Sequence, residues 1–202
     1  MSTSTAAPYP VAIVESAGRL SQLVVNFVGV VPDSTRKTAL QPRAAARSLA
    51  RAAARKAAAT SGSLALPPGP LGLLTLVPDL IAVWKIQSQL VADIAAVYGR
   101  SATLTKEQMV YCLFRHLASQ AVRDLVVRAG ERWLVQRASL ALLQTVASRI
   151  GVHLSKKMIG NSLSRWLPLV GALGVGAYAY YDTNQVASTA MELFERDIEL
   201  LP

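Results

Sequence analysis

The sequence predicts an all-α protein, organised as a single helical bundle in which two Gly-, Ala- and Pro-rich apolar helical segments pack together. Apolar residues recur at three- and four-residue spacing along several long stretches, as they do on the buried face of a helix. No stretch alternates polar and apolar residues in the manner of a half-buried strand. Charged residues make up only 16% of the chain, against about 25% in soluble domains, so the bundle should enclose a large apolar core.

The N-terminal 60 residues are predicted to form a tail and two helices. The tail covers residues 1–10, and Val11–Val31 is an apolar helix candidate that ends at the turn signal beginning with Pro32. An alanine-rich helix should follow Pro42, because alanine has the highest helix propensity. The rest of the chain, residues 61–202, is predicted to form the main helical domain.

The alanine-rich helix carries basic residues at a spacing of four, which places them on one slowly drifting ridge. The ridge consists of Arg43, Arg47, Arg51 and Arg55, with Lys56 beside it. Three interpretations are open: a solvated helix face, contact with anionic lipid or a protein partner, and contact with nucleic acid. Each basic residue near an anionic membrane contributes about 1 kcal/mol. Nucleic acid is the least favoured partner, because no aromatic residues for base stacking are interleaved with the arginines.

The stretch from Pro67 to Gly99 predicts a long core helix with marked ends. Pro78 suits the first turn, and Gly99 suits the left-handed residue that closes a helix. Asp79 would then face the positive end of the helix dipole. Three polar residues at a spacing of four form a seam along this helix, namely Lys85, Gln89 and Asp93. The seam is either an exposed polar surface or a buried network that recognises a partner.

Thr105 and Gln108 have the spacing of a capping box, which predicts the start of a further helix. Cys112 and His116 lie four residues apart on one side of it. A zinc site needs three or four such ligands, and His153 is the only other histidine in the sequence. The sequence therefore predicts a buried thiol and a hydrogen-bonded histidine, with no metal and no cofactor.

Residues 119–150 are predicted to continue as helix, broken near Gly130, with one basic side. The basic residues on this side are Arg123, Arg128, Arg132 and Arg137. Residues 105–165 carry ten basic and three acidic side chains, whereas the chain from Trp166 onward carries one basic and five acidic ones. Basic surfaces are thus separate in sequence from an acidic C-terminal helix.

The last apolar segment, Trp166–Tyr181, repeats small residues that would let another helix approach closely. The glycines expected to serve this packing are Gly171, Gly174 and Gly176. A polar turn is predicted from Asp182 to Gln185, before a final amphipathic helix. The uncharged run of Trp166–Tyr181 is sixteen residues long and falls short of the about 20 residues that a membrane-spanning helix needs.

Motifs of catalysis are absent: the sequence has no G-x-S-x-G, no phosphate-binding loop, no H-E-x-x-H and no cysteine pair. Asp79, Asp93 and Asp182 lie in otherwise apolar helices and could line a pocket of a soluble hydrolase or ligand-binding bundle. A first-turn cap, a seam partner and a helix-end position also explain these three carboxylates separately. Whether the protein is an enzyme stays open, and a non-enzymatic role is favoured.

Several features in a fixed order resemble the EcsC family of bacterial proteins. They are Pro68-Gly69, an Asp79-initiated helix ending in Tyr98-Gly99, the segment Leu167 to Ala172, and the polar residues from Asp182 to Gln185. The chain is also similar to a related helical domain of unknown function in bacterial membrane proteins, some of them joined to small GTPases. The resemblance covers the chain from about Pro67 to the end and supplies no reaction and no catalytic residues.

Taken with the basic ridge, this resemblance implies a non-enzymatic, membrane-associated accessory or scaffolding protein. The expected partners are an anionic lipid surface and a protein. With one cysteine, Cys112, the chain cannot form an intrachain disulfide, and its N-terminus lacks the pattern of a secretory signal. The expected location is therefore the bacterial cytoplasm, at the cytoplasmic face of the membrane, peripheral or shallowly inserted.

Overall fold

The computed structural model describes residues 30–64, 76–116, 126–129, 132–135, 145, 148–149 and 168–198. Four helices are described in these parts of the chain: α2 (Pro42–Leu64), α4 (Leu76–Val97), α5 (Lys106–Phe114) and α8 (Pro168–Ile198). A short 3-10 helix, η1 (Ser101–Thr103), precedes α5, and two strands, β1 (Val126–Ala129) and β2 (Arg132–Val135), form a hairpin. The predicted all-α bundle is confirmed.

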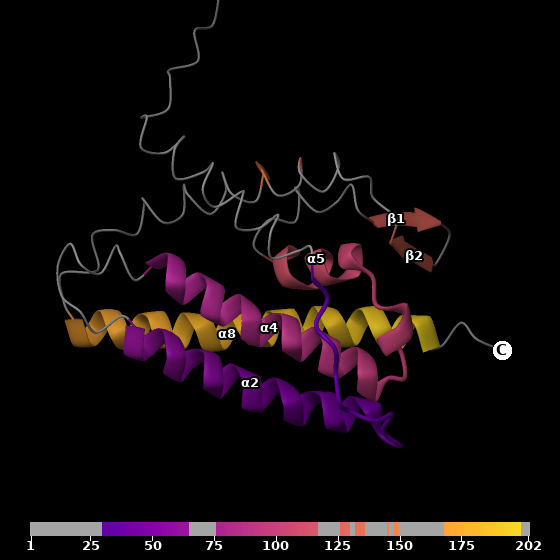
Figure 1. The fold of residues 1–202 in the computed structure, drawn as a ribbon, viewed down its shortest axis with the longest axis horizontal. Helices are drawn as coiled ribbons and strands as arrows, with labels where there is room; N and C mark the ends of the chain where they lie inside the picture. The colour runs from indigo at the N-terminus through magenta and orange to yellow at the C-terminus, as the bar shows by residue number, and fades with distance from the viewer. Residues whose placement is uncertain are drawn as a thin grey trace, which may run out of the picture.

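The three long helices contact one another pairwise, and α5 contacts α4 and α8 (Figure 1). Gly176 of α8 lies against Ala58, near the end of α2, whereas Arg43 at the start of α2 pairs with Glu195 near the end of α8. These two contacts show that α2 and α8 run antiparallel. Tyr98, directly after α4, also bonds to Glu195, so the C-terminal ends of α4 and α8 lie together.

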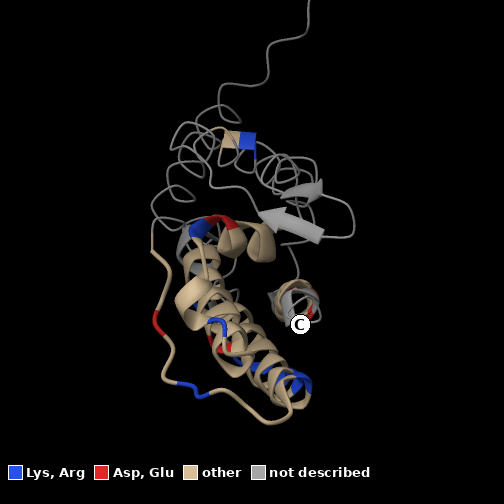
Figure 2. Ribbon diagram, turned by 90° about the vertical axis from the view of Figure 1, so that its right-hand side faces the viewer, with Lys and Arg blue, Asp and Glu red and all other residues tan. Residues whose placement is uncertain are grey.

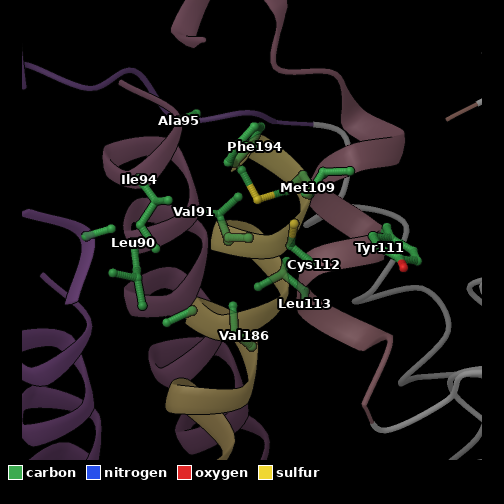
Figure 3. Packing of buried hydrophobic residues seen from close by; sticks show 14 of the residues in the cluster. Leu90, Val91, Ile94, Ala95, Met109, Tyr111, Cys112, Leu113, Val186 and Phe194 are labelled. Carbon is green, nitrogen blue, oxygen red and sulfur yellow. The ribbon is translucent and has the colours of Figure 1, made fainter. Parts of the chain in front are cut away.

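The main core lies between α4, α5 and α8 and is closed by an alanine face of α2. Figure 3 shows side chains from α4, α5 and α8 converging, among them Val91, Leu113 and Phe194. The buried positions of α2 include Ala46, Ala50, Ala54 and Ala57. Because alanine side chains are short, the backbone of α2 can lie close to its neighbours.

The predicted packing of two small-residue segments holds, but the closest approach at a glycine involves a third helix. A Cβ atom added to Gly176 would lie 3.0 Å from the carbonyl oxygen of Ala58, on α2. Ala57, Val83 and Ala179 form a small cluster in which α2, α4 and α8 all meet. Gly174 faces open space and Gly171 lies where side-chain surroundings are outside the described residues, so Gly176 alone among the three predicted glycines has a described close contact.

The turn predicted from Asp182 to Gln185 is wrong, because α8 runs through these residues as one helix of 31 residues. None of the four is glycine or proline, so nothing in the local sequence forces the helix to end. Asp182 and Thr183 are buried, and their side chains bond to Gln87 of α4. The polarity that suggests a turn in the sequence instead serves contacts between helices.

The helix predicted over residues 119–150 is wrong between 126 and 135. Here β1 and β2 pair antiparallel, with Val126 opposite Val135 and Ala129 opposite Arg132. The strands contain three valines and one tryptophan, residue types that favour extended backbone. Glycine at position 130, between the strands, is a residue favoured in two-residue hairpin connections. Arg128 and Arg132 therefore lie in strands, whereas Arg123 and Arg137 lie outside the described residues.

Residues 30–41, named here the N-terminal strap, run without helix along α4 (Figure 1). The predicted helix Val11–Val31 lies outside the described residues except for its last two, which are not helical. The strap backbone is fastened near the end of α4 by a hydrogen bond from the Ala39 amide to the Val97 carbonyl, 3.0 Å long. The predicted boundary between residues 60 and 61 falls within α2.

Two local predictions about helix ends are confirmed. Gly99 has a φ of +73°, the left-handed conformation expected where a helix closes. Thr105 caps α5: its hydroxyl accepts from the Gln108 amide, while the Gln108 side chain accepts from the Thr105 amide. Pro78 lies in the first turn of α4, which begins two residues earlier, at Leu76.

Candidate functional site

The basic ridge of α2 lies on the outside of the bundle. Arg43, Arg47, Arg51, Arg55 and Lys56 are all exposed. In Figure 2, Lys and Arg bands gather at the lower edge of the bundle, which is where α2 lies in Figure 1. No acidic residue occurs in α2, so its cations have no counter-charge on their own helix. No other described helix carries as many residues of one charge sign without an opposite charge.

Compensation of the ridge charge is confined to one end. Arg43 pairs with Glu195 of α8, with 3.3 Å between Nε and Oε1. The Nε atom of Arg55 donates to the carbonyl oxygen of Arg51, which orients the guanidinium along the ridge. Arg47, Arg51, Arg55 and Lys56 have no acidic partner within the part of the chain that the structure describes. The uncompensated cations therefore begin one turn after Arg43 and run from Arg47 to Lys56 along α2.

The polar seam of α4 holds the N-terminal strap. Asp93 accepts hydrogen bonds from Gln89, at 3.0 Å, and from Ser34 of the strap, at 2.7 Å, and its other oxygen lies 3.6 Å from Arg36. Gln89 also donates to the carbonyl oxygen of Asp33. The seam is thus occupied by the chain itself, and Lys85 is exposed at its far end.

A buried polar network that the sequence analysis missed joins α4, the end of α5 and α8. Gln87 donates to Oδ2 of Asp182, at 2.7 Å, and lies 3.3 Å from the Thr183 hydroxyl. Nε2 of His116 lies 2.6 Å from Oδ1 of the same carboxylate. Which of the two atoms donates in this contact is set by the tautomer of the imidazole. The signal in the sequence was Gln87, a large polar residue on the apolar side of α4.

The network is suited to holding three helices together, since each of its hydrogen bonds crosses from one element to another. Asp182 is only 5% exposed, which strengthens its bonds by excluding water. The Nδ1 atom of His116 is also buried and has no hydrogen-bond partner in the structure described here. Hydrogen bonding of the histidine, as predicted, is present, and its partner is a carboxylate 66 residues away.

The three carboxylates of the alternative pocket are not brought together by any contact in the described structure. Asp93 bonds to the strap, Asp182 bonds to Gln87 and His116, and the side chain of Asp79 lies outside the described residues. Among the described residues no group of three or more acidic, histidine or cysteine side chains is placed to hold a metal ion. The proposal of an Asp79/Asp93/Asp182 pocket gains no support from this geometry.

The thiol of Cys112 lies in the apolar core, as predicted. Its side chain is fully buried, and this burial raises the pKa of the thiol well above its ordinary value. A protonated, inaccessible thiol is a poor nucleophile. Cys112 is therefore a packing residue, and it faces the core while His116 faces Asp182.

The C-terminal ends of α4 and α8 are joined by a tyrosine. The hydroxyl of Tyr98 donates to Oε1 of Glu195, at 2.9 Å, and Arg43 reaches the same oxygen. Burial, followed by the bond to Glu195, raises the pKa of Tyr98 above its ordinary range. The cluster ties α2, α4 and α8 together at the end of the bundle opposite to Gly176.

One described stretch, Leu80–Val97 in α4, is long and apolar enough to cross a membrane by length and composition. Most of this stretch, 61%, is buried inside the bundle. A core helix of a soluble protein has the same properties. The stretch is therefore explained by its place in the core.

Comparison with known proteins agrees with the resemblance seen in the sequence. No curated protein and no solved structure matches the chain. The model of the EcsC protein family matches residues 32–196, so the match begins within the N-terminal strap and includes α2 as well as α4, α5 and α8. The match thus starts well before Pro67, where the resemblance of individual motifs begins. The chain belongs to the EcsC protein family.

Proposed function

We propose that this protein is a non-enzymatic accessory protein that docks on an anionic membrane surface through the basic ridge of α2. The observation that carries the proposal is the set of four exposed cations, Arg47, Arg51, Arg55 and Lys56, without acidic partners in the described part of the chain. They lie on a rigid helix whose opposite face is buried, so the cations are presented together without a cost of ordering a flexible segment. The location at the cytoplasmic face of a bacterial membrane is part of the proposal.

The charge of the ridge is large enough for peripheral binding. At about 1 kcal/mol for each basic residue near an anionic surface, four uncompensated cations would contribute about 4 kcal/mol. Such attraction falls off within a Debye length, about 8 Å at physiological ionic strength, so only cations that face the membrane contribute fully. Arg43 should contribute least, because Glu195 compensates its charge.

The test is sedimentation of the full chain with vesicles. Binding should be strong to vesicles that contain phosphatidylserine, weak to pure phosphatidylcholine, and reduced as salt is raised. Changing Arg47, Arg51 and Arg55 together to Gln should weaken binding by about 3 kcal/mol, which is a factor on the order of 100 in the partition coefficient.

A matched control removes three charges elsewhere, with Lys37, Lys85 and Lys106 changed to Gln. All three are exposed and lie outside α2. A protein that docks through the ridge should lose far less binding in this control, whereas attraction by net charge alone would weaken both variants equally. Equal sedimentation with anionic and neutral vesicles at low salt would refute the proposal. Tighter capture by oligonucleotides or by an acidic protein than by vesicles would refute it as well.

A further inference from the structure

The N-terminal half of α8 has an exposed surface of tyrosines with no charge. Tyr178, Tyr180 and Tyr181 are 44%, 41% and 61% exposed, and Gly174 and Ala177 are exposed beside them. The rings of Tyr180 and Tyr181 leave a large part of their apolar area in contact with water. Such a surface is suited to a partner that contacts an apolar ring and leaves the tyrosine hydroxyl hydrogen-bonded.

The tyrosine surface lies level with the last of the uncompensated cations, Arg55 and Lys56, whereas Arg47 and Arg51 lie further along α8. Gly176 lies against Ala58, and from there α2 and α8 run antiparallel to the Arg43–Glu195 pair. In this register, Arg55 lies alongside the part of α8 that contains Tyr180 and Tyr181. The acidic residues that partner Arg43 and Arg115, Glu195 and Glu192, lie toward the other end of α8.

We propose that Tyr180 and Tyr181 join the basic ridge in one membrane-binding face, with the cations on anionic headgroups and the tyrosine rings inserted between them. This inference rests on the proposed function and adds how the protein is oriented and how deeply it enters. Tyrosine favours the membrane–water interface because the ring is apolar and the hydroxyl stays hydrated. The carboxylates of Glu192 and Glu195 lie toward the C-terminal end of α8, outside the tyrosine surface, and are paired with Arg115 and Arg43.

The pattern of charge favours a bilayer over a nucleic acid at this face. Single-stranded nucleic acids bind where aromatic rings and cations alternate along one groove. Here the exposed residues of α8 from Gly174 to Tyr181 include no cation, and the cations lie together on α2. An uncharged aromatic surface beside a cationic one matches the surface of a bilayer, where anionic headgroups lie outside the apolar interior.

The experiment uses a fluorophore sensitive to its surroundings, attached through an introduced cysteine. The natural Cys112 is fully buried, so it need not be removed before labelling. In Tyr181→Cys labelled with nitrobenzoxadiazole, emission should shift to shorter wavelength and increase when vesicles containing phosphatidylserine are added. In the control Ala102→Cys, labelled at an exposed site in η1, emission should stay unchanged.

A second measurement keeps the test independent of the label. In the double variant Tyr180→Ser/Tyr181→Ser, binding at low salt should persist through the ridge, but the fraction that remains bound at high salt should be lost. Salt-dependent binding of the wild type with no emission change at position 181, or with unchanged salt resistance in the double variant, would overturn the inference and leave the proposed function standing. No binding to anionic vesicles at all would overturn both.

Discussion

Replacing Asp182 by Ala should remove the polar contacts that Gln87 and His116 make with this carboxylate of α8. The change leaves the buried Nε2 of Gln87 and the part-buried Nε2 of His116 without their carboxylate partner. Each buried group that loses its partner costs about 1–3 kcal/mol. Gln87 keeps its longer contact to the Thr183 hydroxyl, so we expect a loss of about 3 kcal/mol in the free energy of unfolding.

The matched control is Asp93→Ala, which removes the same side chain from a helix interior. The helix propensities of the original and new residues are the same at both positions, so their effect cancels in the comparison. Asp93 bonds to Ser34 and Gln89 at the surface of α4, where water can replace it. The expected loss is about 1 kcal/mol.

Urea unfolding followed by circular dichroism measures both changes. With a slope of about 2 kcal/mol per M, Asp182→Ala should lower the midpoint by about 1.5 M and Asp93→Ala by about 0.5 M. A double variant with His116→Ala should cost less than the sum of the two single changes, because both act on one hydrogen bond. Equal midpoints for Asp182→Ala and Asp93→Ala would show that the buried network does not stabilise the bundle.

Two further predictions concern packing and pH. Gly176→Val should lower stability by about 1–3 kcal/mol, because the new side chain meets the backbone of Ala58. Gly174→Val should cost less, because position 174 faces open space. Thermal unfolding of the two variants side by side tests this, and equal shifts in the midpoint would contradict it. At alkaline pH, stability should fall with rising pH from about 8.5, the pKa of an unfolded cysteine, because burial raises the pKa of Cys112 and of Tyr98 and both must lose protons on unfolding. The sign follows because the unfolded state binds fewer protons above this pH; Cys112→Ala should flatten the fall between about pH 8.5 and 10, and an unchanged slope would rule out the thiol as its source.

The strap gives a physical reason for the family match to begin at residue 32. Without it, the Asp93 carboxylate would lose its bond to Ser34, and the Gln89 side chain would lose its bond to the Asp33 carbonyl. The strap also passes Gly99, where its Thr38 side chain lies within van der Waals distance of any added Cβ. The strap is therefore part of the bundle fold, although its sequence has no helical pattern.

Local patterns in the sequence determined the features that depend on neighbouring residues. Four-residue spacing placed the arginines of α2 on one exposed ridge, the Thr105 and Gln108 pair marked the start of α5, and Gly99 marked the end of α4. Each of these follows from one turn of helix, so the sequence contains all the information needed. The burial of Cys112 was predictable in the same way, from its position on an apolar helix.

Only the tertiary structure decided the features that depend on residues far apart in the chain. The run from Asp182 to Gln185 has the composition of a turn, yet it is helical. Its buried carboxylate, Asp182, is accommodated by polar contacts with Gln87 and His116. Residues 126–135 have enough apolar character for either helix or strand, and pairing across Gly130 selected the hairpin. The helix that packs against Gly176 could not be predicted either, because small residues favour close helix packing without specifying which helix approaches. Local spacing specifies which side of a helix is buried, but the free energy that selects its partner comes from contacts that exist only in the folded chain.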